Sequence, residues 1–387
     1  MTEATTDNDS PLGKPAESTP PGQLPPTRSG VFTLDSRGPD PKALEPLKDP
    51  AAMPRFPVYP NLAETLNETV DHPDDTVARV LATCAGYGYS TADTVAMIMS
   101  RLGLERNNTR MVALGVDAML IVSTAFLVQS EDGRVVILAY RGTEPDNVIS
   151  WLTDLDVYTD TIQLETDTGA AGFEVHAGFY RNVRATRHEV LAALQRALDG
   201  RSVTEDGSPV DHPMESLYIT GHSLGAAMAA LMAVMLVEDD DYAPIAEKLR
   251  AVYTFGQPMV GSPAFADHCA GLTLRDGSHL QDRLIRYIHR RDVVPRLPPR
   301  ISGRYQHFGL EYEYKGEWPW QQNTTAAGQV RGLTEFALVP LDWAERRLRL
   351  VPIASRLRPF LYSLDDHGPL QYIRALTPPG EPTEFGD

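Results

Sequence analysis

The residues Gly221-His222-Ser223-Leu224-Gly225 have the pattern of a serine presented for nucleophilic attack. They stand between a short apolar stretch, residues 217–220, and an almost wholly apolar run, residues 224–237. A serine at a sharp turn from strand to helix is exposed at the end of a sheet, and flanking glycines let the backbone pass closely. The start of the helix supplies backbone N–H groups to an oxyanion. The pattern predicts that Ser223 is a nucleophile, and an idle serine in a glycine-rich turn is the alternative.

A nucleophilic serine needs a base, and the base needs an acid that orients it. Where the serine occupies such a turn, the acid and then the histidine follow it along the chain. Asp292 comes just after an expected strand, residues 286–289, and is followed by Val293-Val294-Pro295. We therefore predict that Asp292 is the acid; the alternative is a turn aspartate paired with a neighbouring arginine.

Two histidines follow Asp292 in the chain. His307 lies in residues 305–311, whose alternating pattern is typical of a strand with packed side chains. His367 lies in a polar turn before a short helix, and a histidine on a loop can reach over the end of a sheet. The spacing favours His367 as the base and leaves His307 open.

The helices and strands that must position these residues can be recognised from the spacing of apolar residues along the chain. We expect helices over residues 76–85, 92–102, 185–198 and 224–237. We expect strands over residues 119–128 and 135–140, joined by a tight turn, and over residues 217–220, 249–255 and 284–289. Strands alternating with helices predict an α/β fold with a mostly parallel sheet.

The composition limits the class of protein. The chain has 387 residues, 42% of them hydrophobic, and a net charge of −17. This apolar content excludes wholesale disorder, and the acidic balance argues against nucleic acid as a partner. Residues 1–55 are rich in proline, so we expect a disordered tail there and a single domain over residues 56–387.

The two cysteines, Cys84 and Cys269, form neither a disulfide framework nor a zinc module. Two buried thiols are favoured over one long-range disulfide. The N-terminus lacks the basic and apolar regions of a signal peptide, and residues 111–128 are too interrupted for a transmembrane segment. These features lead us to expect a cytoplasmic protein without a transmembrane segment.

Five motifs occur in a fixed order along the chain. They are Tyr140-Arg141-Gly142-Thr143 with Trp151 and Asp154, Val175-His176-Ala177-Gly178-Phe179, residues 219–226, residues 254–261 and residues 292–299. Together they resemble the class 3 lipase family, the fungal-type triacylglycerol lipases and their bacterial and plant relatives. The resemblance implies an α/β-hydrolase fold and a bacterial-type member of this family.

The resemblance also implies roles for individual residues. The catalytic residues would be Ser223 as nucleophile, Asp292 as acid and His367 as base. His367 is followed by Leu370 and Tyr372, with the tyrosine one position earlier than in the family's pattern. The oxyanion hole would be formed by the backbone N–H groups of Thr143 and Leu224. The implied lid, residues 144–155, and substrate-binding positions include Val148, Trp151, Leu152 and His222.

The expected activity is the hydrolysis of lipid esters through an acyl-enzyme on Ser223, at a lipid–water interface and without a metal or cofactor. A phospholipase A1 or short-chain esterase of the same fold, and a non-catalytic binding module, are the alternatives. A helical insertion is expected at about residues 315–364. Its arginine-rich part, residues 343–362, is interpreted either as an anchor at a lipid interface or as a helical segment packed on the domain.

Overall fold

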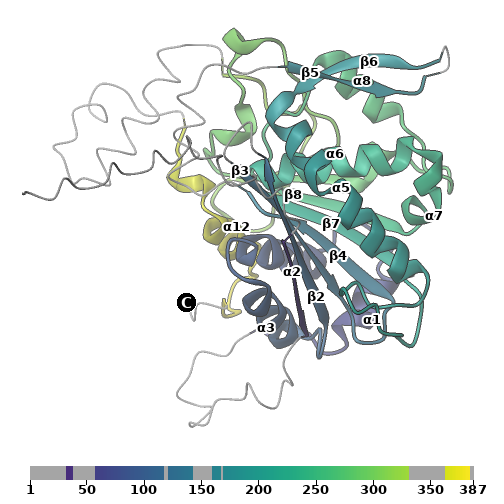
Figure 1. Cartoon of the computed structure of the whole chain (residues 1–387). Helices are drawn as coiled ribbons and strands as arrows, with labels where there is room; N and C mark the ends of the chain where they lie inside the picture. The colour runs from purple at the N-terminus through teal and green to yellow at the C-terminus, as the bar shows by residue number, and fades with distance from the viewer. Residues whose placement is uncertain are drawn as a thin grey trace, which may run out of the picture. The chain divides into compact units, whose positions relative to one another are not determined.

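The computed structural model describes residues 32–37, 57–116, 121–142, 159–166, 169–330 and 362–383. Within these residues the main feature is a nine-stranded sheet of order β1-β2-β3-β4-β7-β8-β9-β10-β11 (Figure 1). Its strands are β1 (Phe32–Arg37), β2 (Asn108–Val116), β3 (Ile121–Gln129), β4 (Val135–Tyr140), β7 (Ser216–His222), β8 (Leu249–Phe255), β9 (Leu284–His289), β10 (Leu310–Tyr314) and β11 (Gln321–Asn323). A separate antiparallel pair is formed by β5 (Thr159–Leu164) and β6 (Ala171–His176).

The centre of the large sheet is parallel. Strand β4 pairs in parallel with β7, β7 with β8, β8 with β9, and β9 with β10. The flanking pairs, from β1 to β4 on one side and β10 with β11 on the other, are antiparallel. The carboxyl ends of the parallel strands therefore meet at one edge, where functional residues of such sheets gather.

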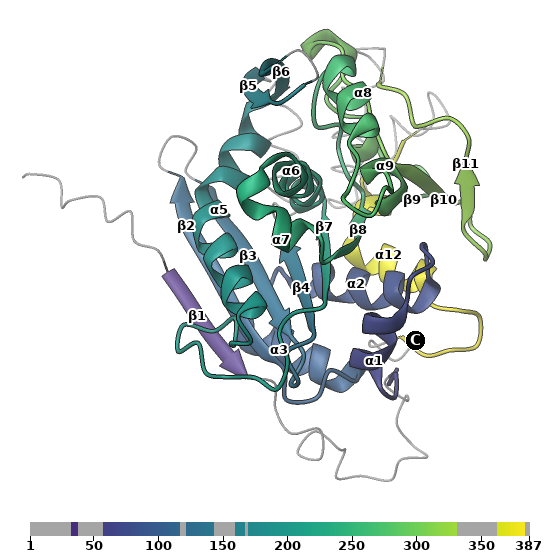
Figure 2. The ribbon, with the colours of Figure 1, turned by 90° about the vertical axis from the view of Figure 1, so that its right-hand side faces the viewer.

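Helices cover both faces of this sheet (Figure 2). They are α1 (Leu62–Glu68), α2 (Asp75–Tyr87), α3 (Ala92–Leu102), α5 (Ala177–Leu198), α6 (Leu224–Glu238), α7 (Ala243–Ala246), α8 (Pro263–Gly271), α9 (Leu280–Arg283) and α12 (Pro369–Leu376). In β4, Val136, Leu138 and Tyr140 pack with α5 and α6, whereas the alternate residues pack with α2 and α3. All six β4 side chains are buried, as expected for a strand covered on both faces.

Most of the expected elements are present, and the bounds of α3, β4, β8 and β9 match the prediction. Strand β2 was not predicted: the strand expected over residues 119–128 corresponds to β3 alone, and β2 pairs with it. Helix α5 begins at Ala177, earlier than expected, because His176 caps it by accepting a hydrogen bond from the N–H of Gly178 at 3.1 Å.

The expected tail and insertion both differ from the structure where it describes them. Residues 32–37 are not disordered: they form β1, which adds to the otherwise open edge of β2. The described parts of the expected insertion, residues 315–330 and 362–364, contain β11 and no helix. The remaining tail residues and residues 331–361, with most of the arginine-rich segment, lie outside the described residues.

Cys84 and Cys269 are both free and buried, which excludes the disulfide between them. They lie in different hydrophobic clusters, Cys84 with α2 and α3 and Cys269 with α5 and α6. Among the described residues, no helix combines the length and apolar character that crossing a membrane requires.

Candidate active site

Ser223 lies at the turn where β7 ends and α6 begins, at the carboxyl edge of the parallel strands. Its backbone has φ 60° and ψ −130°, a conformation that a residue other than glycine adopts only under strain. Its N–H donates to the carbonyl of Phe255 at 2.9 Å, which ties the turn to the end of β8. A Cβ at Gly225 would collide with the carbonyl oxygen of Tyr140, so the close approach of α6 to β4 requires glycine there.

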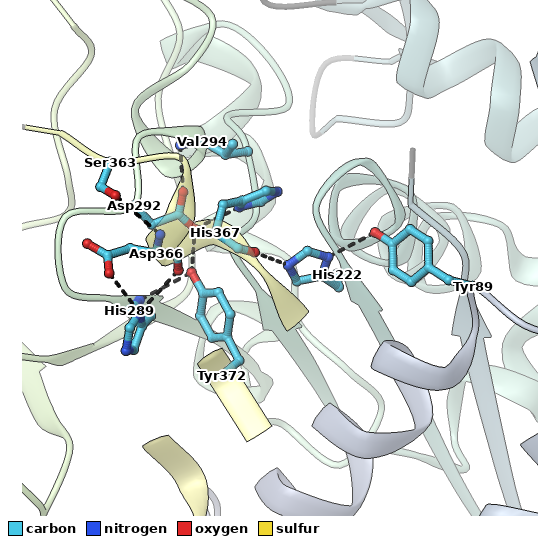
Figure 3. Close-up of polar contacts among 9 residues, drawn as sticks. All are labelled: Tyr89, His222, His289, Asp292, Val294, Ser363, Asp366, His367 and Tyr372. Atoms are coloured by element: carbon cyan, nitrogen blue, oxygen red, sulfur yellow. Dashed lines mark hydrogen bonds and ion pairs between the residues drawn. The ribbon is translucent and has the colours of Figure 1, made fainter. Parts of the chain in front are cut away.

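Asp292 follows β9 and is 1% exposed. Its Oδ2 accepts hydrogen bonds from His367 Nδ1 at 2.8 Å and from the Tyr372 hydroxyl at 2.6 Å, and its Oδ1 accepts from the N–H of Val294 at 2.9 Å (Figure 3). Burial opposes ionisation, but the charge of His367 and these hydrogen bonds hold the pKa of the Asp292 carboxyl below its usual range. Asp292 therefore stays an anion that can stabilise an imidazolium.

His367 ends a short 3-10 helix, Asp365–His367, directly before α12. Because its Nδ1 contacts the Asp292 carboxylate, the proton of a neutral imidazole lies on Nδ1 and Nε2 is left as the acceptor. Nε2 is buried and makes no hydrogen bond to the described residues. Gly256, with φ 62°, makes room for this pair: a Cβ there would lie 2.8 Å from His367 Cε1 and 2.9 Å from Asp292 Oδ2.

His307, the other histidine left open by the spacing, has a different environment. Its Nε2 donates to the carbonyl of Pro295 at 2.7 Å. Burial, together with the charge of Arg286, lowers the pKa of His307 well below its usual value. The structure thus pairs Asp292 with His367 and leaves His307 as a neutral histidine bonded to a loop carbonyl.

Of the two predicted oxyanion donors, the structure describes Leu224 but not Thr143. Leu224 is the first residue of α6, and an N–H in the first turn of a helix has no intrahelical partner. Thr143 lies outside the described residues, but a Cβ at the preceding residue, Gly142, would lie 3.2 Å from Ser223 Cβ. The end of β4 therefore runs beside the serine. The predicted lid positions Val148, Trp151 and Leu152 also lie outside the described residues.

His222 has partners other than the predicted lid or substrate. It is 3% exposed, and its ring nitrogens contact the Tyr89 hydroxyl and the backbone carbonyl of His367. Two tyrosines of the site were not predicted as functional residues: Tyr89 had no predicted role, and Tyr372 had only a motif position. The signal for Tyr372 was its place in the short helix expected directly after His367; Tyr89 gave no signal, because its contact spans 133 residues of chain.

The order of these residues on the fold can be compared with known proteins. The model of the family described as lipase (class 3) matches residues 137–302. The match includes the turn of Ser223 and extends past Asp292. This part of the chain is therefore similar to the class 3 lipase family.

Individual proteins that the chain resembles are also described as lipases. A lipase of Rhizomucor miehei is 28% identical over 192 residues, which are 49% of this chain and 44% of that protein. The triacylglycerol lipase OBL1 of Arabidopsis thaliana is 28% identical over 204 residues, 48% of this chain and 38% of that protein. The chain thus spans less than half the length of these curated relatives. They are a fungal and a plant protein, and the expectation of a bacterial-type member gains no support from them.

Among solved structures, lipase II from Rhizopus niveus is similar with a TM-score of 0.50 at 20% identity, over 76% of this chain and 92% of that one. At this identity the likeness shows the fold. The central parallel strands, the helices on both faces and the sharp turn at Ser223 are those of the predicted α/β-hydrolase fold.

Proposed function

We propose that this protein is a serine carboxylester hydrolase that cleaves lipid esters, with Ser223 as nucleophile, His367 as base and Asp292 as acid. The observation that carries the proposal is the buried 2.8 Å contact between His367 Nδ1 and Asp292 Oδ2, at the carboxyl edge of the sheet where the strained turn holds Ser223. The chain order of serine, aspartate and histidine is that of α/β-hydrolases.

The chemistry follows from the protonation states that the contacts support. His367 Nε2 accepts the proton of the Ser223 hydroxyl as the oxygen attacks the ester carbonyl, and the ionised Asp292 stabilises the resulting imidazolium. The imidazolium then protonates the leaving alcohol, which leaves an acyl group on Ser223. A water molecule that gives its proton to His367 attacks this acyl group and releases the carboxylic acid.

The developing oxyanion needs donors at the same edge. The N–H of Leu224 is one, supported by its place at the start of α6, and Thr143 is proposed as the other because Gly142 lies beside Ser223. Loss of one such donor costs about 2.7–4 kcal/mol of transition-state stabilisation. The substrate class, a lipid ester, is supported by the family of residues 137–302 and by the triacylglycerol lipase named among the relatives.

The test is hydrolysis of p-nitrophenyl butyrate and labelling by a fluorophosphonate probe. Ser223→Ala should abolish both, because it removes the hydroxyl on which the acyl-enzyme is proposed to form, whereas Ser278→Ala, in an exposed turn after α8, should keep both. Full activity of Ser223→Ala contradicts the assignment. A wild-type protein that neither reacts with the probe nor hydrolyses esters favours the binding module. Rates on monomeric and aggregated esters, and on a phospholipid, then separate the lipase from the short-chain esterase and the phospholipase.

A further inference from the structure

The side chain of His222 is held between two segments that are distant in the sequence. Its Nε2 is 2.6 Å from the backbone carbonyl oxygen of His367, and its Nδ1 is 2.9 Å from the hydroxyl of Tyr89, in the turn between α2 and α3 (Figure 3). The rings of His222 and His367 lie with their centroids 4.6 Å apart at 32°. His222 is also the residue directly before Ser223, so one side chain links the nucleophile's strand to the backbone of the base.

The partners of His222 define which nitrogen carries its proton. A carbonyl oxygen only accepts hydrogen bonds, so Nε2 must be the donor to His367. Burial, followed by the charge of His367, lowers the pKa of His222 to about 3, so the ring is neutral and Nδ1 accepts from the Tyr89 hydroxyl. A hydroxyl that donates to Nδ1 favours the tautomer in which Nε2 faces the carbonyl with a proton.

Tyr89 also lies against the segment that leads to the proposed oxyanion donor. A Cβ at Gly142 would collide with the Tyr89 hydroxyl and would lie 2.5 Å from the carbonyl oxygen of His222. The same hydroxyl is thus close to the end of β4 and bonded to the histidine that holds the base. Tyr89 and His222 together therefore connect three segments of the site: the end of β4, the end of β7 and the loop that carries His367.

We propose that Tyr89 and His222 are positioning residues for the reaction, because together they fix the backbone of the base His367 relative to Ser223 through one neutral imidazole in a single tautomer. This inference rests on the proposed function for its catalytic meaning. It goes further by assigning a role to His222, the second residue of the Gly-His-Ser-Leu-Gly motif. His222 holds the backbone of His367 in place, which the turn of Ser223 does not itself require.

Three variants separate positioning from simple packing. In His222→Leu the donor to the His367 carbonyl is lost, and kcat on p-nitrophenyl butyrate should fall about 10- to 100-fold with KM within about twofold, as for a misplaced catalytic group. His222→Gln keeps an N–H donor, so it should recover most of this loss. Tyr89→Phe removes only the hydroxyl, and kcat should fall about 3- to 10-fold, in keeping with one hydrogen bond. Tyr242→Phe, in a 3-10 helix beside α7, is the matched control and should keep wild-type kcat.

The second readout needs no activity. Nitrogen-15 spectra of the imidazoles should show His222 as the Nε2–H tautomer in the wild-type protein and in Tyr89→Phe, with the Nδ1 resonance shifted in Tyr89→Phe because Nδ1 no longer accepts a hydrogen bond. Equal losses of kcat in His222→Leu and His222→Gln, wild-type kcat in Tyr89→Phe, or losses that only follow a lower melting temperature overturn the proposal. An inactive wild-type protein overturns the proposed function and with it the catalytic meaning of the pair, whereas the spectra still test the contact itself.

Discussion

The nucleophile and the base of this site are held in different ways. The turn of Ser223 is fixed by backbone: a strained conformation, a hydrogen bond from its N–H to Phe255 and a glycine that lets α6 approach β4. His367 is held by side chains from other elements, namely Asp292, which also binds Tyr372, and His222. The first arrangement can be recognised from five consecutive residues, 221–225, whereas the second is assembled from segments up to 145 residues apart. Substitutions in each region should therefore fail in different ways.

The largest effect is expected at the base. In Asp292→Asn the amide can donate to His367 Nδ1, which moves the imidazole proton to Nε2, where it blocks proton transfer from Ser223. We expect kcat to fall about 10⁴-fold with the fold intact, as for loss of the acid in a serine triad. Steady-state kinetics and circular dichroism check this, with Asp366→Asn as the control next to His367. A loss below tenfold in Asp292→Asn contradicts the assigned acid.

In the nucleophile turn, Gly225→Ala should damage the protein through its backbone. The new methyl would overlap the carbonyl of Tyr140 and the backbone of Arg141, so α6 and the turn must shift. We expect the free energy of unfolding to fall by about 1–3 kcal/mol and the activity to fall about 100-fold. Urea denaturation and ester hydrolysis measure both. Gly271→Ala, at the end of α8 with open space around it, is the matched control, and equal behaviour of the two variants would falsify this account.

A smaller effect is expected at Tyr372, which supports the acid. In Tyr372→Phe, Asp292 loses a 2.6 Å hydrogen bond and the pKa of its carboxyl rises, because this bond helps to keep it low. One hydrogen bond to a charged group contributes about 1.5–3 kcal/mol, so kcat should fall about 10- to 100-fold. The control is Tyr314→Phe, whose hydroxyl makes no hydrogen bond to the described residues and whose ring stacks on His289. Similar kcat values for both variants would show that Tyr372 only packs.

The smallest effect is expected at His176, which lies outside both regions and affects only the pH dependence of stability. Burial lowers the pKa of His176 to about 4, against about 6.5 in an unfolded chain. Between these values the unfolded chain binds the extra proton, so stability is highest above pH 6.5 and falls as the pH drops, by at most about 1.4 kcal/mol per pH unit from this residue. His176→Asn keeps a helix cap and should flatten this slope in urea denaturation at pH 5 and 7. An unchanged slope contradicts the role of His176, and His212→Gln, at an exposed position, is the control.

The contrast between the two regions also explains what the sequence could predict. The buried central strands are continuously apolar in β4 and mostly apolar in β8 and β9, and all three were predicted to the residue. Strand β2 was missed because its polar residues, such as Asn108 and Arg110, are satisfied by contacts that no local pattern reveals; Arg110 pairs with Glu189 on α5. Strand β1 depends on the free edge of β2 and not on its own six residues.

The same reasoning applies to the site. Ser223 could be placed from its own motif, and Asp292 from the strand before it. His367 could be ranked above His307 only by a weak argument from loops, because the bond that distinguishes them joins residues 75 positions apart. Tyr89 could not be found at all, since its role depends on where α2 and α3 place their connecting turn against β7.

The reactivity of the two buried thiols can be used to measure local unfolding on each face of the sheet. Burial raises the pKa of Cys84 to about 12, and that of Cys269 well above its usual value, so neither is a reactive thiolate in the folded protein. Because each belongs to the cluster on a different face of the sheet, the rate at which each reacts with a thiol reagent reports the exposure of its own face. Mass spectrometry of the labelled peptides would show whether the two layers separate together or one after the other.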